Sequence, residues 1–258
     1  MQVVFVLAAV VSAAFLILPT LVVVPMSFST AVSFEFPPPS YWMGYYRSFV
    51  SNDSWLLATR NSFLIAILAT VLTMALVVPV AFAYVRERFM GRGLMNLVIM
   101  SPLLVPAIVS ALGYYGFYGF LGLNGKIPGV VLAHCALAVP MTFLVVSATI
   151  KGFDHTYERA AMISGAGPFR TFFHVTLPIL WPGMATGALF AFLASFNEAV
   201  VALFIAGRDA STLPKKMFES IRVDTDPIIA VVSTLLISGV VFGLLVSILF
   251  KARNTHAR

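Results

Sequence analysis

The segment YERAAMISGAGPFRTFFHVTLP, residues 157–178, is polar at its start and lies between two long apolar runs. Residues 157–164 are suited to a short helix. Residues 165–167, Gly-Ala-Gly, then interrupt that helix, because glycine tolerates the left-handed conformation that ends helices. Pro168 is well placed in the first turn of a second helix. The segment therefore predicts a short helix, a sharp turn and a helix that runs back into an apolar stretch.

The composition is that of a membrane protein. Of the 258 residues, 60% are hydrophobic and only 10% are charged, whereas a soluble domain carries about 25% charged residues. The net charge of +6 does not indicate nucleic acid binding, because the basic residues are scattered between apolar stretches. The single cysteine, Cys135, excludes an intrachain disulfide and is interpreted as a small buried hydrophobe.

Six stretches are long and apolar enough to cross a bilayer, which takes about 20 residues. These stretches are residues 3–26, 62–85, 94–121, 127–150, 177–205 and 228–250. The expected fold class is all-α: a polytopic membrane protein with six transmembrane helices in one domain, residues 1–258. The first stretch has no basic n-region and is too long for a typical signal peptide, so we expect it to be retained.

The connecting segments predict an orientation. Assigning the Arg-rich loop 86–93, the polar loop 151–176 and the C-terminal tail to the cytoplasm places nine of the 16 Lys and Arg residues inside. Both termini are then cytoplasmic. Segments 27–61 and 206–227 become the external loops, the first of them with an extended part, a short interfacial helix and several aromatic residues. Asn61, at the mouth of the second stretch, is interpreted as an interfacial anchor.

The polar segment resembles the EAA loop of ABC importer permeases, which docks on the ATP-hydrolysing subunit. The residues that carry the resemblance are the ERAA run at 158–161, Gly165 and the VTLP run at 175–178. Arg159 stands where the motif has glutamate, and Glu158 lies one position earlier. The six-stretch layout resembles a type I ABC importer permease. SFNEAVVALFIAG (195–207) and LPKKMFESIR (213–222) are similar to the spermidine/putrescine branch of that family.

This resemblance implies a transport subunit of the bacterial inner membrane that is not itself an enzyme. It implies a second, homologous permease, two ATP-binding cassette subunits and a periplasmic substrate-binding protein as partners, besides membrane lipid. No cofactor is expected in this chain, because ATP and Mg are bound by the ATPase partners. The substrate implied is a polyamine or a related small organic cation, and amino-acid-like compounds, phosphonate and iron are the alternatives within the family. The residues implied in ATPase coupling are Glu158, Arg159, Ala160, Ala161, Gly165, Gly167 and Pro168.

Glu198 is the only carboxylate deep within a predicted stretch, where a charge must face the bundle interior or water. With Asn197 and Phe196 it forms a candidate substrate pathway, in which the carboxylate attracts a cation and the ring offers a cation–π face. The alternative is a structural or gating role that involves no substrate contact. His134, in the fourth stretch, is interpreted as a packed, hydrogen-bonded residue rather than a proton relay.

Other classes of function find little support. The chain has no G-x-x-x-x-G-K-[ST] motif, so it is not expected to hydrolyse ATP, and it has no H-E-x-x-H or G-x-S-x-G motif. A stand-alone secondary transporter would need more coupling-ion chemistry than one glutamate and one histidine supply. An intramembrane enzyme or a membrane scaffold remains the rival from another class. For the segment 157–178 itself, the rival is an amphipathic helix that rests on lipid headgroups.

Overall fold

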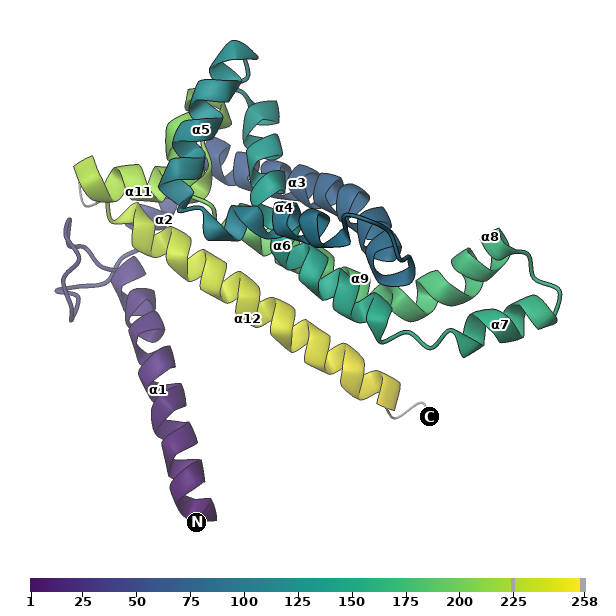
Figure 1. Ribbon diagram of the computed structural model, residues 1–258. Helices are drawn as coiled ribbons and strands as arrows, with labels where there is room; N and C mark the ends of the chain where they lie inside the picture. The colour runs from purple at the N-terminus through teal and green to yellow at the C-terminus, as the bar shows by residue number, and fades with distance from the viewer. Residues whose placement is uncertain (224–225, 256–258) are drawn as a thin grey trace. The chain divides into compact units, whose positions relative to one another are not determined.

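The structure is a computed structural model that describes residues 1–223 and 226–255, and these residues are almost entirely helical (Figure 1). One isolated antiparallel bridge, between Ser29 and Tyr41, is the sole β pairing of the described residues. The elements are α1 (Gln2–Ser27), α2 (Gly44–Ser51), α3 (Asp53–Arg86), α4 (Arg92–Leu104), α5 (Ala107–Phe120), α6 (Ile127–Lys151), α7 (Thr156–Ile163), α8 (Pro168–Thr171), the π-helical η1 (Phe172–Thr176), α9 (Leu177–Phe196), α10 (Val200–Ile205), the 3₁₀ turn η2 (Arg208–Ala210), α11 (Leu213–Val223) and α12 (Ile228–Thr255).

Within the described residues, five helical segments are long and apolar enough to cross a membrane, and a bent pair of helices can supply a sixth crossing. The five segments are Val4–Met26, Asp53–Arg86, Ile127–Lys151, Pro168–Phe196 and Ile228–Val246. The predicted all-α class is therefore confirmed, and the predicted count of six is reached when the bent pair is taken as one crossing.

The third predicted stretch, 94–121, is not one continuous helix. It consists of α4 and α5, which are bent by 104° at a short break. Val105 is extended there, with ψ 127°, and Pro106 follows with ψ 136°. Pro106 has no N–H to continue the ladder of α4, and the residue before a proline avoids the helical region. The two effects together explain the bend.

The chain divides into two compact units. The first contains Met1–Leu56 and the described part of Met217–Arg258. In it α1 packs on α12, where the Thr234 hydroxyl donates to the Val23 carbonyl at 3.5 Å. The aromatic residues of the 27–61 loop close it on itself: Trp42 Nε1 donates to the Ser29 carbonyl at 2.9 Å. The short helix α2 matches the predicted helix, whereas the part before it folds back on itself instead of being extended.

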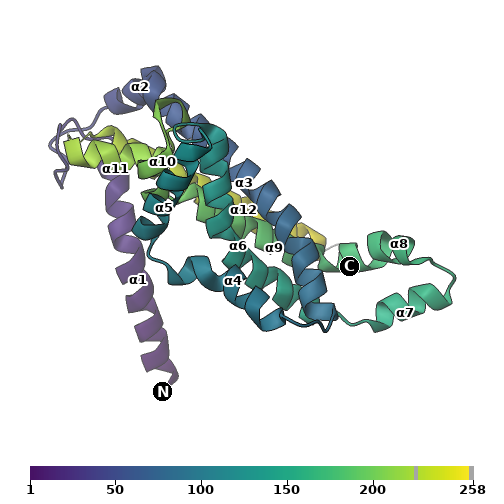
Figure 2. The ribbon, with the colours of Figure 1, turned by 45° about the horizontal axis from the view of Figure 1, so that its top comes forward.

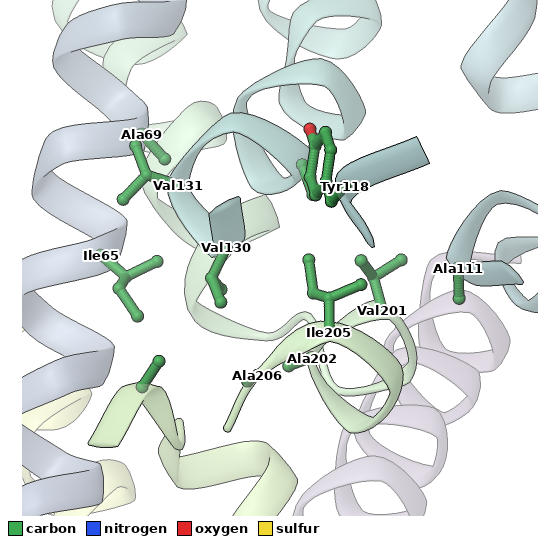
Figure 3. Close-up of a cluster of buried hydrophobic side chains, with 12 residues drawn as sticks. Ile65, Ala69, Ala111, Tyr118, Val130, Val131, Val201, Ala202, Ile205 and Ala206 are labelled. Carbon is green, nitrogen blue, oxygen red and sulfur yellow. The ribbon is translucent and has the colours of Figure 1, made fainter. Parts of the chain in front are cut away.

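The second unit, Leu57–Lys216, contains the helices that position the candidate site. Its centre is α6, whose inner residues are buried along most of its length. One apolar cluster joins α3, α5, α6 and α10, with Ile65, Val130 and Ile205 among its members (Figure 3). A second cluster joins α3, α6 and α9 and includes Phe143 and Leu180. Burial of these side chains holds the unit together.

Small residues line the contact between α6 and α9. A Cβ added at Gly183 would overlap the Thr149 side chain, and one added at Gly187 would lie 2.8 Å from Val146 Cγ2. Small residues allow helix backbones to approach in membranes, where packing rather than water expulsion drives association. The pair α6 and α9 therefore forms the frame from which both candidate sites extend.

Candidate coupling surface and substrate pathway

The polar segment forms a projection at the end of α6 and α9. Figures 1 and 2 show α7 and α8 side by side, joined by a turn that lies away from the other helices of this unit. Gly165 ends α7 with φ 87°, a left-handed conformation, and Pro168 occupies the first turn of α8. The predicted helix, turn and second helix are therefore confirmed.

Most of the residues implied in ATPase coupling are exposed on this projection. Arg159, Ala160, Gly165, Gly167 and Pro168 are exposed, and Ala161 is half-buried. Large apolar side chains flank them: Ile163 is 88% exposed and Phe169 is 81% exposed. Pro168 and Phe169 also line a shallow apolar hollow with Phe172 and Phe173. An exposed apolar surface of this kind, next to small residues, is typical of an interaction site.

Glu158 differs from its neighbours, because it points back into the protein. Its side chain is only 15% exposed, and Oε1 accepts hydrogen bonds from Arg86 Nη2 at 2.8 Å and from the Thr176 hydroxyl at 2.5 Å. His155 Nδ1 lies 3.2 Å from Oε2. Burial raises the pKa of Glu158, but the hydrogen bonds from Thr176, Arg86 and His155 outweigh burial, so the pKa lies below its ordinary value.

The charged partner of Glu158 is held by aromatic rings. Arg86 ends α3, and its guanidinium lies 4.9 Å from the centroid of the Phe82 ring and 5.9 Å from that of Phe153. Such contacts favour a cation over an aromatic face. Glu158 and Arg86 therefore fasten α7 to the end of α3. The sequence did not indicate this pair, which is 72 positions apart in the chain.

Thr176 connects the same cluster to α9. It is fully buried and lies in η1, the π-helical segment that joins α8 to α9. At the start of α7, the Asp154 carboxylate accepts the Thr156 N–H at 2.9 Å. This hydrogen bond to the backbone lowers the pKa of Asp154 and satisfies a free N–H of the first turn. Polar contacts therefore fix both the start of α7 and the base of the projection.

The second candidate site lies at the other end of α9. The predicted stretch 177–205 was wrong as a continuous helix, because α9 ends at Phe196 and α10 begins at Val200. Glu198 therefore lies in a break rather than deep within a helix. Its carboxylate accepts the Val201 N–H at 2.9 Å, in the first turn of α10, where the helix dipole favours a negative charge. This contact satisfies one of the backbone N–H groups that the start of any helix leaves free.

The three pathway residues of the sequence analysis differ in exposure. Asn197 is exposed and Glu198 is half-buried, so both are accessible in this chain. Phe196 is buried and packs on Phe63, at 5.1 Å between ring centroids, and on Phe192, at 5.4 Å. Its aromatic contacts are therefore with other rings, and a cation–π role for it is not supported by its packing.

A polar contact missed by the sequence analysis fixes the segment beyond α10. Asn61, predicted as an interfacial anchor, is buried within the protein, and its amide donates to the carbonyls of Asp209, at 2.9 Å, and Ser211, at 3.1 Å. The next residue, Ser62, accepts the Leu213 N–H at 2.6 Å. In the sequence, the Asn-Ser pair at the start of an apolar stretch could have indicated a buried polar contact. The neighbouring residues, however, do not identify the distant backbone groups that the pair binds.

The described residues contain no group of three or more His, Cys, Asp or Glu side chains arranged to hold a metal. The candidate sites consist instead of an exposed projection and a polar break in a membrane helix. Their chemistry is that of contact, motion and recognition.

Comparisons with known proteins agree with this geometry. Residues 75–255 match the family described as binding-protein-dependent transport system inner membrane component. The putrescine transport system permease protein PotI of Escherichia coli (strain K12) is 29% identical over 237 residues, which are 88% of this chain and 83% of that protein. The diacetylchitobiose uptake system permease protein NgcG of Streptomyces coelicolor is 30% identical over 205 residues, 74% of this chain and 67% of that protein.

A solved structure supports the fold. A bacterial ABC transporter involved in the import of the acidic polysaccharide alginate contains a chain that matches with a TM-score of 0.69 at 17% identity, over 97% of this chain and 95% of that one. Permeases of such importers are multi-pass inner membrane subunits that are not themselves enzymes, and they work with a partner permease, an ATPase and a substrate-binding protein. The chain belongs to the family of binding-protein-dependent transport system inner membrane components, and it is a permease subunit of an ABC importer.

Proposed function

We propose that this permease docks on its ATPase partner through α7 and the turn that follows it, and that it carries a polyamine or a related small organic cation. The observation that supports the docking is the contrast within α7. Arg159 and Ala160 are exposed, whereas Glu158 is bonded inward to Arg86 and Thr176. One face of α7 is hydrogen-bonded to the rest of the chain and the other is exposed. A soluble subunit that binds the exposed face and moves can therefore displace α7, and the displacement is transmitted to α3 and α9.

The proposed substrate class rests on two observations. The relative PotI is named for putrescine transport, and Glu198 places a half-buried carboxylate at the break between α9 and α10. A carboxylate in a membrane segment attracts cations and repels anions. The relative NgcG is named for diacetylchitobiose uptake, so this uncharged sugar is the alternative substrate that a test should include.

In the proposed complex, residues 1–258 act as a single permease domain and form half of the translocation pathway. A second, homologous permease forms the other half, two ATP-binding cassette subunits hydrolyse ATP with Mg, and a periplasmic binding protein delivers the substrate. Segment 151–176 and both termini lie in the cytoplasm, and segments 27–61 and 206–227 lie outside. The distribution of Lys and Arg among the loops supports this orientation.

The docking is tested in proteoliposomes that contain the complete importer. Ala160→Trp places a large side chain on the exposed face of α7, and it should abolish uptake and the stimulation of ATP hydrolysis by the loaded binding protein. Met90→Trp is the matched control, because Met90 is fully exposed in a different loop. Equal activity of the two variants would refute the docking surface.

The substrate class is tested in the same vesicles with labelled putrescine, spermidine and diacetylchitobiose. Putrescine or spermidine should accumulate when ATP is enclosed with the ATPase subunits, and the sugar should not. Accumulation of the sugar alone would overturn the polyamine assignment and leave the docking proposal unaffected.

A further inference from the structure

A buried polar pair connects α6 to the end of α9. His134 Nδ1 and the Ser195 hydroxyl share a hydrogen bond of 2.9 Å, and both residues are almost fully buried, at 1% and 3% exposed. A polar pair inside an apolar frame is costly unless its hydrogen bond is made. Neither residue is exposed enough to contact a docking partner, so the role of the pair must lie within the chain.

The pair lies directly beside the break that carries Glu198. The Ser195 carbonyl accepts the Glu198 N–H at 3.3 Å, and the Glu198 carboxylate accepts the Val201 N–H at 2.9 Å. A continuous series of contacts therefore runs from His134 in α6, through Ser195, to Glu198 and the start of α10. On the same turn, Phe196 is packed against Phe63 of α3.

We propose that His134 is a positioning residue for Glu198, acting through the Ser195 hydroxyl. This inference rests on the proposed function, in which Glu198 attracts the cationic substrate. The last turn of a helix has free carbonyls and frays unless side chains hold it. The hydrogen bond from His134 fixes that turn of α9 against the long, well-packed helix α6, and so fixes where the carboxylate stands.

The geometry distinguishes two amide replacements of His134. The side-chain amide of asparagine lies close to the place of Nδ1, the ring atom that bonds Ser195. The amide of glutamine lies close to the place of Nε2, which has no hydrogen-bond partner among the described residues. His134→Asn should therefore keep the contact with Ser195, whereas His134→Gln and His134→Leu should lose it.

The first test measures uptake of labelled putrescine by the complete importer in proteoliposomes. His134→Leu and His134→Gln should raise the KM by about tenfold, the effect of one lost buried hydrogen bond, with the maximal rate less affected. His134→Asn should restore the KM to within about twofold. In a Glu198→Gln background, His134→Leu should raise the KM no further. Additive losses, or no rescue by asparagine, would overturn the positioning role.

The second test needs no substrate. Asn197 is exposed at the break, so a cysteine there reports its position in a chain whose only other cysteine is removed by Cys135→Ala. The rate at which a small thiol reagent labels Asn197→Cys in the assembled importer should change several-fold with His134→Leu and stay unchanged with His134→Asn. Equal rates for all variants would overturn the inference. A shifted rate in an importer that moves no polyamine would support it and refute only the proposed substrate.

Discussion

Two glutamates at opposite ends of the α9 segment are held in different ways. Glu158, beside the start of this segment, accepts hydrogen bonds from Arg86 and Thr176 and lies near His155. Glu198, beyond its end, is bonded through its carboxylate to one backbone N–H, that of Val201. The first carboxylate is paired with a cation inside the protein, whereas the second has fewer hydrogen bonds among the described residues.

This difference separates the two tasks proposed for these glutamates, coupling to the ATPase and attraction of the substrate. A carboxylate whose oxygens are shared with an arginine and a buried threonine fixes one helix to others. A half-buried carboxylate with a single neutral donor can still receive a cation. We therefore interpret Glu158 as the residue that anchors the coupling surface from inside. Glu198 is the group that we propose contacts the substrate.

The largest effect is expected from removing the charged partner of Glu158. Arg86→Leu leaves a mostly buried carboxylate without its cation, which should weaken the anchoring of α7 by about 1.5–3 kcal/mol. ATP-driven uptake should fall by about one to two orders of magnitude, while ATP hydrolysis becomes independent of substrate. Arg88→Leu, at an exposed position of the same loop, is the control. Normal coupling in Arg86→Leu would remove the contrast between the two glutamates.

The turn that exposes the coupling surface should be almost as sensitive. Gly165 has φ 87° with open space around it, so a side chain meets backbone strain rather than a clash. Gly165→Val should cost more than the roughly 1–2 kcal/mol of an ordinary residue, because valine is β-branched. Gly93→Val is the control, because Gly93 lies in α4 outside the coupling surface, has no positive φ and is equally open. Substrate-stimulated ATP hydrolysis should fall with the first variant and not with the second.

A smaller, selective effect is expected at the other glutamate. Glu198→Gln keeps an oxygen for the Val201 N–H and removes only the charge. Loss of attraction in a partly hydrated site amounts to about 1 kcal/mol, so the KM for polyamine should rise about fivefold. Assembly of the importer, followed by size-exclusion chromatography, should be unaffected. Loss of assembly would make Glu198 a structural residue like Glu158.

The smallest effect is the pH dependence of the anchor. The pKa of Glu158 lies below its ordinary value of 4.5, so ionisation of this group stabilises the folded state. That contribution is complete above pH 4.5 and is lost as the pH falls through the lowered folded pKa. Thermal unfolding of the detergent-solubilised protein should therefore show a drop in Tm in this acidic range that is reduced in Glu158→Gln. An identical pH profile for both proteins would contradict the anchoring role.

The sequence predicted the features that depend on short stretches of chain. The length of the apolar runs predicted the membrane-spanning helices. Gly165 and Pro168 predicted the turn of the projection, because their backbone preferences act locally. The inward direction of Glu158 was not predictable in this way. Its partner Arg86 lies on another helix, and only tertiary packing brings the two together.

Proline alone does not locate the two breaks. Pro79, Pro140 and Pro182 lie within helices that continue through them. Pro106 instead follows an extended residue at a 104° bend. The break at Asn197–Ala199 contains no proline at all. Whether a chain bends in a membrane depends on which neighbouring groups satisfy the freed backbone, and that information is not in the local sequence.

The length of α3 has a mechanical consequence. Its 34 residues make a rod about 51 Å long, well beyond the roughly 30 Å of hydrocarbon in a bilayer. Arg86, at one end, is hydrogen-bonded to Glu158 of the projection. Asn61, toward the other end, is hydrogen-bonded to the segment after α10. A helix bonded at two distant points moves as one rigid body. Tilting α3 would therefore displace the projection and the segment after α10 together, without a chain of side-chain rearrangements through the core.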